Sequence, residues 1–276
     1  MESIFHSFYI LSCFIALRES YLNKVSGHLF VVRALGSNKR SLEEFIEELV
    51  DWDEATRGEA AKALGETEDE EAIDPLLKAL MEDESEDVRA SAARALGKFY
   101  GNNRIPKELG LIIEEEISPI VRIAIANSIG NLENISAAKL MIPVLERDES
   151  IWVREAIIDA FGKIGSKEFT DLILKYLKDD PSEEVRVQAA VALLKCSDKS
   201  ILDDILVLFQ KENSDEVKSH IAGIIANLAD IKSVELLTTA LENDDFKLTQ
   251  AATAEALHNI AQKLGYKDDN EMLDSL

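Results

Sequence analysis

The chain has 276 residues, 53 of them acidic and 30 basic, so its formal net charge at pH 7 is −23. Such a surplus repels nucleic acid and anionic membranes and disfavours both as partners, unless a local basic groove offsets it. The only two cysteines, Cys13 and Cys196, lie too far apart for a metal or redox motif and fit a cytoplasmic protein.

The first segment, residues 1–38, lacks the pattern that governs the rest of the chain. Residues 4–17 read IFHSFYILSCFIAL, an apolar run shorter than the ~18–20 residues that span a bilayer. Only Met1, Glu2 and Ser3 precede it, so the basic start of a signal peptide is missing. Three interpretations stay open: a helix that caps the first repeat, a weak membrane anchor, or an upstream extension of the true coding region.

Residues 39–276 repeat one motif every 32 or 33 residues. A serine precedes a basic residue, here called the anchor, by four positions, and a valine directly precedes the anchor: Ser85, Ser118, Ser150, Ser182 and Ser214 with Val88, Val121, Val153, Val185 and Val217. The anchors are Arg57, Arg89, Arg122, Arg154, Arg186 and Lys218. Such a period predicts a solenoid with six full units, and Gln250 marks a partial seventh.

Each unit is expected to begin with an alanine-rich first helix. The serine would cap it by accepting a backbone N–H, and the acids that follow suit the positive end of the helix dipole. Small residues four and six positions after the anchor, such as Ala93 and Ala95, predict close contact between stacked helices. Eight positions after the anchor, a left-handed glycine is expected to end the helix in four units: Gly65, Gly97, Gly130 and Gly162.

An amphipathic second helix is expected after each turn. Ile73, Leu76, Leu77 and Leu80 show the spacing of one buried helical face. The predicted second helices are residues 70–82, 106–116, 136–148, 167–179, 199–212 and 232–243. No segment alternates with a period of two, so the sequence predicts an all-α, right-handed α-solenoid of stacked antiparallel helix pairs.

The runs Val88–Gly97 and Ala72–Leu80 resemble HEAT-like repeats of the short type found in phycobilisome bilin lyases. The resemblance covers about residues 40–265. It implies a HEAT-repeat, armadillo-like solenoid that acts as a protein-binding scaffold or, alternatively, as a bilin lyase-like or chaperone-type enzyme subunit. The motif is a packing consensus, so it says little about function.

No catalytic, cofactor or metal motif is found, and none of these sites is predicted. The histidines are His6, His28, His220 and His258, and none is followed by glutamate. Among proteins with this type of repeat, the deoxyhypusine hydroxylases carry repeated His-Glu pairs. Because this sequence has no such pair, their activity is not expected here. His220 and His258 differ by six residues of helical rise, about 9 Å, which is too far for a shared metal.

A protein or peptide partner is predicted to bind the second helices, which line the concave face of related solenoids. Their outward positions, 17, 21 and 24 residues after the anchor in the five regular units, hold six acids and four bases among fifteen residues. A surface of such mixed charge is not expected to bind the phosphate backbone of a nucleic acid. The candidate binding residues are Asp74, Lys78, Lys139, Asp171, Lys175, Lys178, Asp203 and Glu235, with Tyr100 from an irregular loop.

That loop, Phe99–Pro106, adds one residue to the period. It is either a binding loop at a rim or a tolerated insertion with Phe99 in the core. Because each anchor follows a cap that carries acids, the anchors are interpreted as partners in ion pairs within or between repeats, aligned by stacking, and each exposed pair would contribute ~0–1 kcal/mol. Trp52 and Trp152 are expected to pack against the starts of their helices, and an exposed tryptophan would instead be a candidate binding hot spot.

Overall fold

The computed structural model describes residues 40–275 except 229 and 244–246. The apolar segment 1–38 and its three interpretations lie outside the described residues. The chain divides into two compact units, residues 1–44 and 45–276. In the first unit, the Ser41 hydroxyl accepts the Glu44 N–H (3.2 Å) and the Glu44 carboxylate accepts the Ser41 N–H (2.7 Å). This reciprocal capping box starts helix α2 (Leu42–Glu48).

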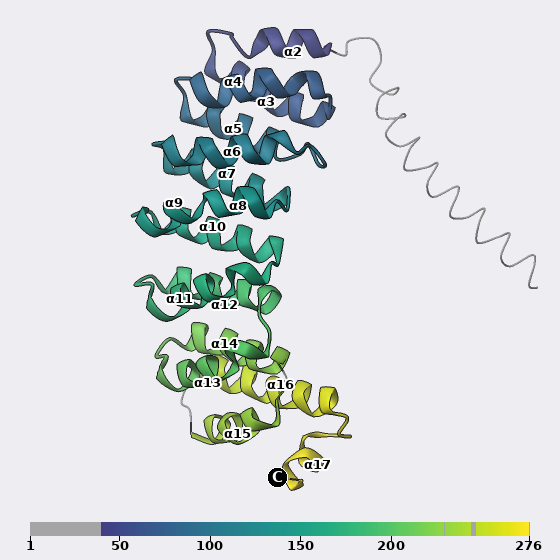
Figure 1. Cartoon of the computed structure of the whole chain (residues 1–276), viewed down its shortest axis with the longest axis vertical. Coiled ribbons are helices and arrows are strands. Elements are labelled where there is room, and N and C mark those ends of the chain that lie inside the picture. Colours follow the sequence, from purple (N-terminus) through teal and green to yellow (C-terminus); the bar gives the residue numbers. More distant parts are fainter. Residues whose placement is uncertain (1–39, 229, 244–246, 276) are drawn as a thin grey trace, which may run out of the picture. The chain divides into compact units, whose positions relative to one another are not determined.

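The second unit is a stack of helix pairs (Figure 1). The first helices are α3 (Glu54–Thr67), α5 (Glu86–Leu96), α7 (Pro119–Asn131), α10 (Ile151–Ile164), α12 (Glu183–Cys196), α14 (Asp215–Leu228) and α16 (Lys247–Leu264). The second helices are α4 (Ile73–Glu82), α6 (Arg104–Glu115), α8 (Ile135–Leu140) with α9 (Ile142–Arg147), α11 (Thr170–Asp179), α13 (Leu202–Lys211) and α15 (Val234–Asn243). A short α17 (Asp269–Asp274) follows α16. The described part contains no strand, and the predicted all-α solenoid of helix pairs is confirmed.

The second helices follow their predicted ranges closely. Four of them begin with a single 3-10 turn, η1 (Glu70–Ala72), η2 (Lys167–Phe169), η3 (Lys199–Ile201) and η4 (Ile231–Ser233). The third is divided at Met141, because Pro143 has no N–H to donate to the carbonyl four residues earlier.

The serine caps are confirmed in three repeats and wrong in two. Ser85, Ser182 and Ser214 accept the N–H of the valine three residues later, at 3.2–3.4 Å. Ser118 and Ser150 make no such bond. The hydroxyls of Ser85, Ser118 and Ser214 also donate a hydrogen bond to a glutamate one repeat earlier. The acceptors are Glu54, Glu86 and Glu183 respectively. These hydroxyls therefore also join successive repeats.

The expectation of left-handed glycines eight residues after the anchor is wrong. Gly97 has a φ of −65°, and Gly65, Gly130 and Gly162 lie within helices. Each glycine faces the small residue six positions after the next anchor: Gly65 faces Ala95, Gly97 faces Ser128, Gly130 faces Ala160 and Gly162 faces Ala192. A Cβ on any of these glycines would come within 3.0 Å of that neighbour. Glycine is therefore the spacer that lets successive first helices touch.

The core is continuous along the stack. The valines before the anchors are at most 1% exposed, and the Phe161 and Phe169 rings stack with centroids 4.2 Å apart. The irregular loop contributes Phe99, which is buried, while Tyr100 is 70% exposed and Gly101 adopts a φ of +81°. The interpretation that placed Phe99 in the core is therefore confirmed.

The spacer role predicts opposite effects for one substitution at two positions of α3. We expect Gly65→Ala to destabilise the protein by ~1–3 kcal/mol, because its Cβ would lie 2.7 Å from the Ala95 Cα. Gly58→Ala is the matched control, since a Cβ there meets no atom within 4 Å, and it should stabilise the helix by ~0.5–1 kcal/mol. Urea unfolding followed by circular dichroism measures both changes. Equal midpoints for the two variants would contradict the spacer role.

Candidate functional site: the arginine ladder and the second-helix surface

Each anchor arginine binds the carboxylate that closes its own second helix. We call this series the arginine ladder: Arg57 with Asp83, Arg89 with Glu116, Arg122 with Asp148, Arg154 with Asp180, and Arg186 with Glu212. The shortest nitrogen-to-oxygen distances lie between 2.7 and 3.3 Å. The predicted ion pairs are thus formed within each repeat, and the partner is the acid 26 or 27 residues after the anchor.

The ladder also fixes the turn between repeats. The Arg89 Nη1 donates to the Asp83 carbonyl oxygen at 2.9 Å, while the Asp83 carboxylate accepts the Ser85 N–H at 2.9 Å. The other ladder arginines likewise donate to backbone carbonyls five or six residues earlier. One acid therefore binds an arginine of its own repeat and holds the first turn of the next.

Burial makes these pairs differ from ordinary surface ion pairs. The ladder side chains are only 3–18% exposed, so the contribution expected of exposed pairs does not apply to them. Burial alone would raise the pKa of Asp83, but hydrogen bonds from Arg57 and the Ser85 N–H outweigh it and hold that pKa below its ordinary value. Glu116 behaves in the same way, with bonds from Arg89 and the Ser118 N–H lowering its pKa.

The sixth anchor differs from the other five. The Lys218 ammonium lies 5.2 Å from the centre of the Phe209 ring, a cation–π geometry. Position 244, where the next ladder acid would stand, is outside the described residues. The ladder as described therefore runs from α3 to α12.

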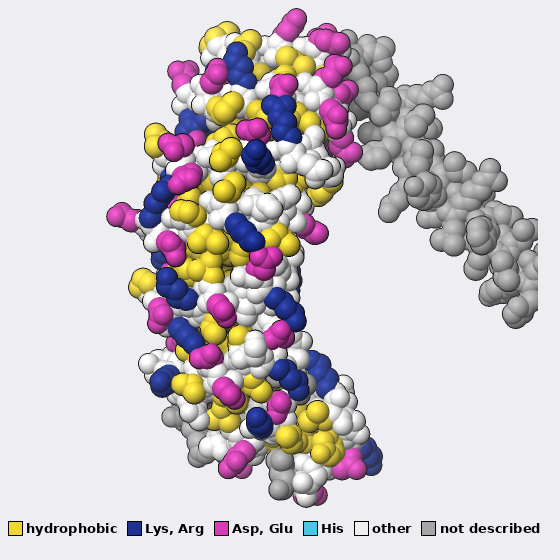
Figure 2. All heavy atoms as spheres, in the orientation of Figure 1, with side chains coloured by type: hydrophobic (Ala, Val, Ile, Leu, Met, Phe, Trp, Pro, Cys, Tyr) yellow, Lys and Arg dark blue, Asp and Glu magenta, His cyan; other side chains and the backbone are white. Residues whose placement is uncertain are grey.

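Three grooves lie between successive second helices, and each opens onto the ladder. The first, about 740 Å³, is lined by residues 46–51 and α4 beside Arg57 and Asp83. The second, about 440 Å³, lies between α6 and α9, and the third, about 550 Å³, between α11 and α13. Basic, acidic and hydrophobic side chains are interspersed across the face seen in Figure 2. We call the outward side of α4 to α15, with these grooves, the second-helix surface.

All nine candidate binding residues are exposed. Asp74 and Lys78 line the first groove, and Lys178 lines the third. Three candidates form ion pairs with a neighbouring repeat: Asp74 with Arg104 (2.7 Å), Lys139 with Glu168 (2.5 Å) and Lys178 with Asp204 (2.7 Å). Asp171, Lys175, Asp203 and Glu235 stand on α11, α13 and α15. The structure thus places eight candidates on one surface and ties some of them across repeats.

Of the four aromatic residues Trp52, Tyr100, Trp152 and Tyr176, only Tyr176 is buried. Tyr100 precedes α6, at the opposite end of the repeat from the grooves. Tyr176 is buried and donates its hydroxyl proton to the Leu145 carbonyl at 3.0 Å. Trp52 is 90% exposed and Trp152 is 60% exposed, so the expectation that they pack against their helix starts is wrong.

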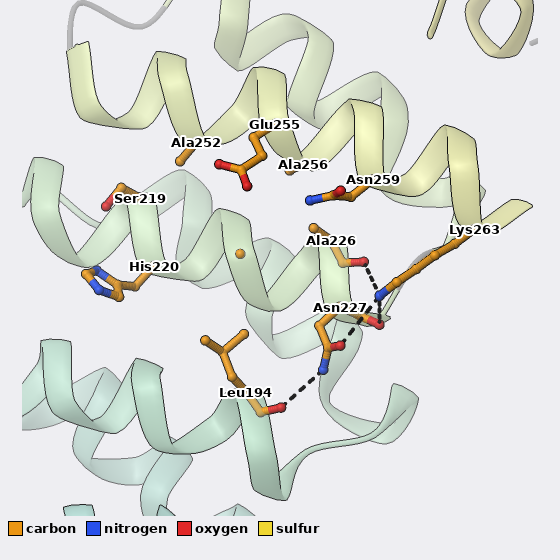
Figure 3. Close-up of a pocket in the computed structure, with 11 residues that line it drawn as sticks. Leu194, Ser219, His220, Ala226, Asn227, Ala252, Glu255, Ala256, Asn259 and Lys263 are labelled. Atoms are coloured by element: carbon orange, nitrogen blue, oxygen red, sulfur yellow. Dashed lines mark hydrogen bonds between the residues drawn. The ribbon is translucent and has the colours of Figure 1, made fainter. Parts of the chain in front are cut away.

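A further groove, about 520 Å³, lies between the first helices α14 and α16 (Figure 3). The Lys263 ammonium donates to the Ala226 and Asn227 carbonyls, both at 3.1 Å, and the Asn227 amide donates to the Leu194 carbonyl at 3.2 Å. Gly223 stands where other repeats carry larger residues such as Lys62 and Arg94, and a Cβ there meets nothing within 4 Å. This groove was not predicted from the sequence. The signal that could have indicated it is the glycine at position 223, where other repeats have a larger residue.

The two histidines in the described part of the chain make local contacts. His220 Nδ1 lies 2.9 Å from the Glu216 carbonyl oxygen, and His258 Nδ1 lies 3.1 Å from an Asp269 carboxylate oxygen. Among the described residues, no group of His, Cys, Asp and Glu could hold a metal ion. In the same part of the chain, no helix has both the length and the apolar character to cross a membrane.

A family model for HEAT repeats matches residues 42–109, 106–194 and 170–258, which is well over half of the chain. The chain belongs to the HEAT-repeat family. A comparison with curated proteins gave no match.

Two solved structures resemble this HEAT-repeat protein over most of its length. One is the complex of CpcE and CpcF of phycocyanin lyase from Nostoc sp. PCC7120, with 25% identity, a TM-score of 0.50, and coverage of 88% of this chain and 97% of that one. The other is YibA of Escherichia coli, with 19% identity, a TM-score of 0.57, and coverage of 86% and 91%. The second likeness concerns the fold alone. The first agrees with the short repeat type that the sequence indicates.

Breaking the ladder should destabilise this HEAT-repeat protein in a pH-dependent way. Asp83→Asn leaves Arg57 buried without its carboxylate, so the free energy of unfolding at pH 7 should fall by ~3–5 kcal/mol. Asp87→Asn, in the same turn but exposed, should change it by less than ~0.5 kcal/mol. Urea unfolding at pH 7 provides the comparison.

The pH dependence follows from the lowered pKa of Asp83. Its contribution is complete above the unfolded value of about 3.9 and disappears as the pH falls through the lower folded value. The stability difference between the natural protein and Asp83→Asn should therefore narrow between about pH 5 and pH 2. A difference that stays constant over this range would show that the Asp83 charge is not what stabilises the turn.

Proposed function

We propose that this HEAT-repeat protein binds another protein along its second-helix surface and acts as a scaffold or adaptor without catalysing a reaction. The observation that carries the proposal is the row of grooves between successive second helices, flanked by exposed charges of both signs. A repeated surface of this kind suits an extended partner that contacts several repeats. Cross-repeat ion pairs such as Lys178 with Asp204 hold the surface in one arrangement before binding.

The free thiol supports a location in the cytoplasm. Cys196 is unpaired and buried, and burial raises the pKa of its thiol to about 11. A protonated, enclosed thiol neither oxidises readily nor pairs, which suits a protein of a reducing compartment.

Charge reversal on the second-helix surface tests the proposal. A partner is first isolated with the natural protein and its affinity is then measured with pure components. The double variant Lys175→Glu, Lys178→Glu should weaken binding about tenfold, equivalent to ~1.4 kcal/mol. The matched control is Lys62→Glu, Lys195→Glu, which reverses two exposed charges on first helices and should leave the affinity unchanged. Equal affinity of both double variants would place the contact elsewhere.

The likeness to the phycocyanin lyase complex favours one alternative, a subunit of a heteromeric lyase or of a related chaperone-type enzyme. In that case the partner is a second repeat subunit, and a cofactor-bearing protein is the substrate. Co-expression with a bilin, its acceptor protein and a partner subunit tests this alternative. A coloured covalent adduct that requires this chain would support it, and its absence would favour the scaffold.

A further inference from the structure

Half of the chain's net charge lies along one edge of the stack. Turns join α2, α4, α6, α9, α11 and α13 to the first helices that follow them, and these six turns with the adjoining helix ends span residues 49–56, 81–88, 114–121, 146–153, 178–185 and 210–217. They contain twenty-one acids and three bases, and the six adjoining anchors add six positive charges. The result is −12 of the total −23. We call these turns the acidic rim; they form the left edge in Figures 1 and 2.

The acidic rim also exposes large apolar side chains. Those with the largest exposed fractions are Trp52 (90%), Ile117 (86%), Val50 (78%), Trp152 (60%), Met81 (57%) and Ile120 (42%). Both tryptophans of the chain are among them. Exposed tryptophan is uncommon on a surface of a protein with no partner and is enriched where proteins bind one another.

Three of these side chains belong to adjoining repeats. Ile120 and Trp152 both stand two residues before an anchor, at the starts of α7 and α10, which pack against each other. The axes of packed helices lie about 8–10 Å apart. Ile117 lies in the turn that leads into α7. We call these three residues the Trp152 patch.

The neighbourhood of the Trp152 patch combines apolar and negative groups. The groove between α6 and α9 adjoins it and is lined by Pro119 and Val144, by Glu149, and by Glu114, which forms an ion pair with Arg147 of the same groove (3.7 Å). The ladder neutralises the buried Glu116 and Asp148, but Glu115 and Glu149 are exposed. The surface therefore attracts cations and offers a tryptophan face that can also contact them.

We propose that the Trp152 patch docks a basic amphipathic segment of another protein. Its apolar side chains would cover Ile117, Ile120 and Trp152, while its lysines or arginines would meet the carboxylates of the acidic rim. Charge complementarity selects this occupant, because a second copy of the chain would bring one strongly negative rim against another. Ile117, Ile120 and Trp152 themselves lie on the acidic rim, beside the second-helix surface and outside it, so this contact goes beyond the proposed scaffold function.

A defined peptide tests the proposal with the full chain. The probe is an 18-residue helical peptide of leucine and lysine, free of tryptophan, with leucines spaced to form one face. Its scrambled version has the same charge and composition but no apolar face. We expect the helical peptide to bind more tightly than the scrambled one by about tenfold or more, as measured by fluorescence anisotropy of labelled peptides. Trp52→Phe leaves Trp152 as the only tryptophan, whose emission should shift to shorter wavelength on binding.

Site variants locate the contact. Trp152→Ala with Ile117→Ser should weaken the helical peptide about tenfold, whereas Tyr100→Ala, an exposed aromatic at the opposite edge, should not change its affinity. Circular dichroism checks that the variants are folded. Lys175→Glu, on the second-helix surface and outside the acidic rim, should not weaken peptide binding, so a failure of the second-helix proposal stays distinguishable from a failure of this one.

Several results would overturn the proposal. Equal affinity for the helical and scrambled peptides would reduce the rim to a nonspecific charged surface. If the Trp152→Ala, Ile117→Ser variant binds the helical peptide as tightly as the natural protein, or if neither protein binds it, the patch is not a docking site. Sedimentation velocity that shows a dimer dependent on Trp152 would assign the patch to a second copy of the chain instead.

Discussion

In each of the first five repeats, the anchor arginine reaches the carboxylate at the end of its own second helix. The same carboxylate accepts the N–H of the serine that begins the next repeat, and the next arginine binds the carbonyls of that turn. One buried ion pair thus sets the angle within a helix pair and the junction between pairs. Its geometry explains why this turn hardly varies in length, because an insertion here would move the serine away from the carboxylate and the next arginine away from the carbonyls of the turn.

Contact between the first helices depends on a second constraint, the absence of a side chain at one position. Gly65, Gly97, Gly130 and Gly162 each admit the small residue of the following repeat. At the next interface the corresponding positions hold Leu194 and Ile224, and the glycine rule ends. The groove of Figure 3 lies in this later part of the stack, where Gly223 leaves space that a larger residue fills elsewhere. Small differences at repeated positions therefore determine where the surface is hollow.

The distribution of charge separates folding from recognition. Ladder acids are buried and neutralised, whereas most other acids of the same turns are exposed beside apolar side chains such as Trp152 and Ile117. The second-helix surface instead carries charges of both signs, several of them paired across repeats. The two surfaces differ in charge, and we have proposed a different partner for each of them.

The sequence by itself determined the helix pairs, their period and the family, because caps, valines and apolar stripes are local signals that recur in every repeat. It also identified the anchors as structural. It did not reveal their partners, since an acid 26 residues away, such as Asp83, comes next to Arg57 only after the helix pair closes. Likewise, the roles of Gly97 and Trp152 were misjudged: a glycine after a helix usually signals a left-handed turn, and a tryptophan usually packs inward. Only the stacking of one repeat on the next decides whether such a residue is a spacer, a core residue or an exposed contact.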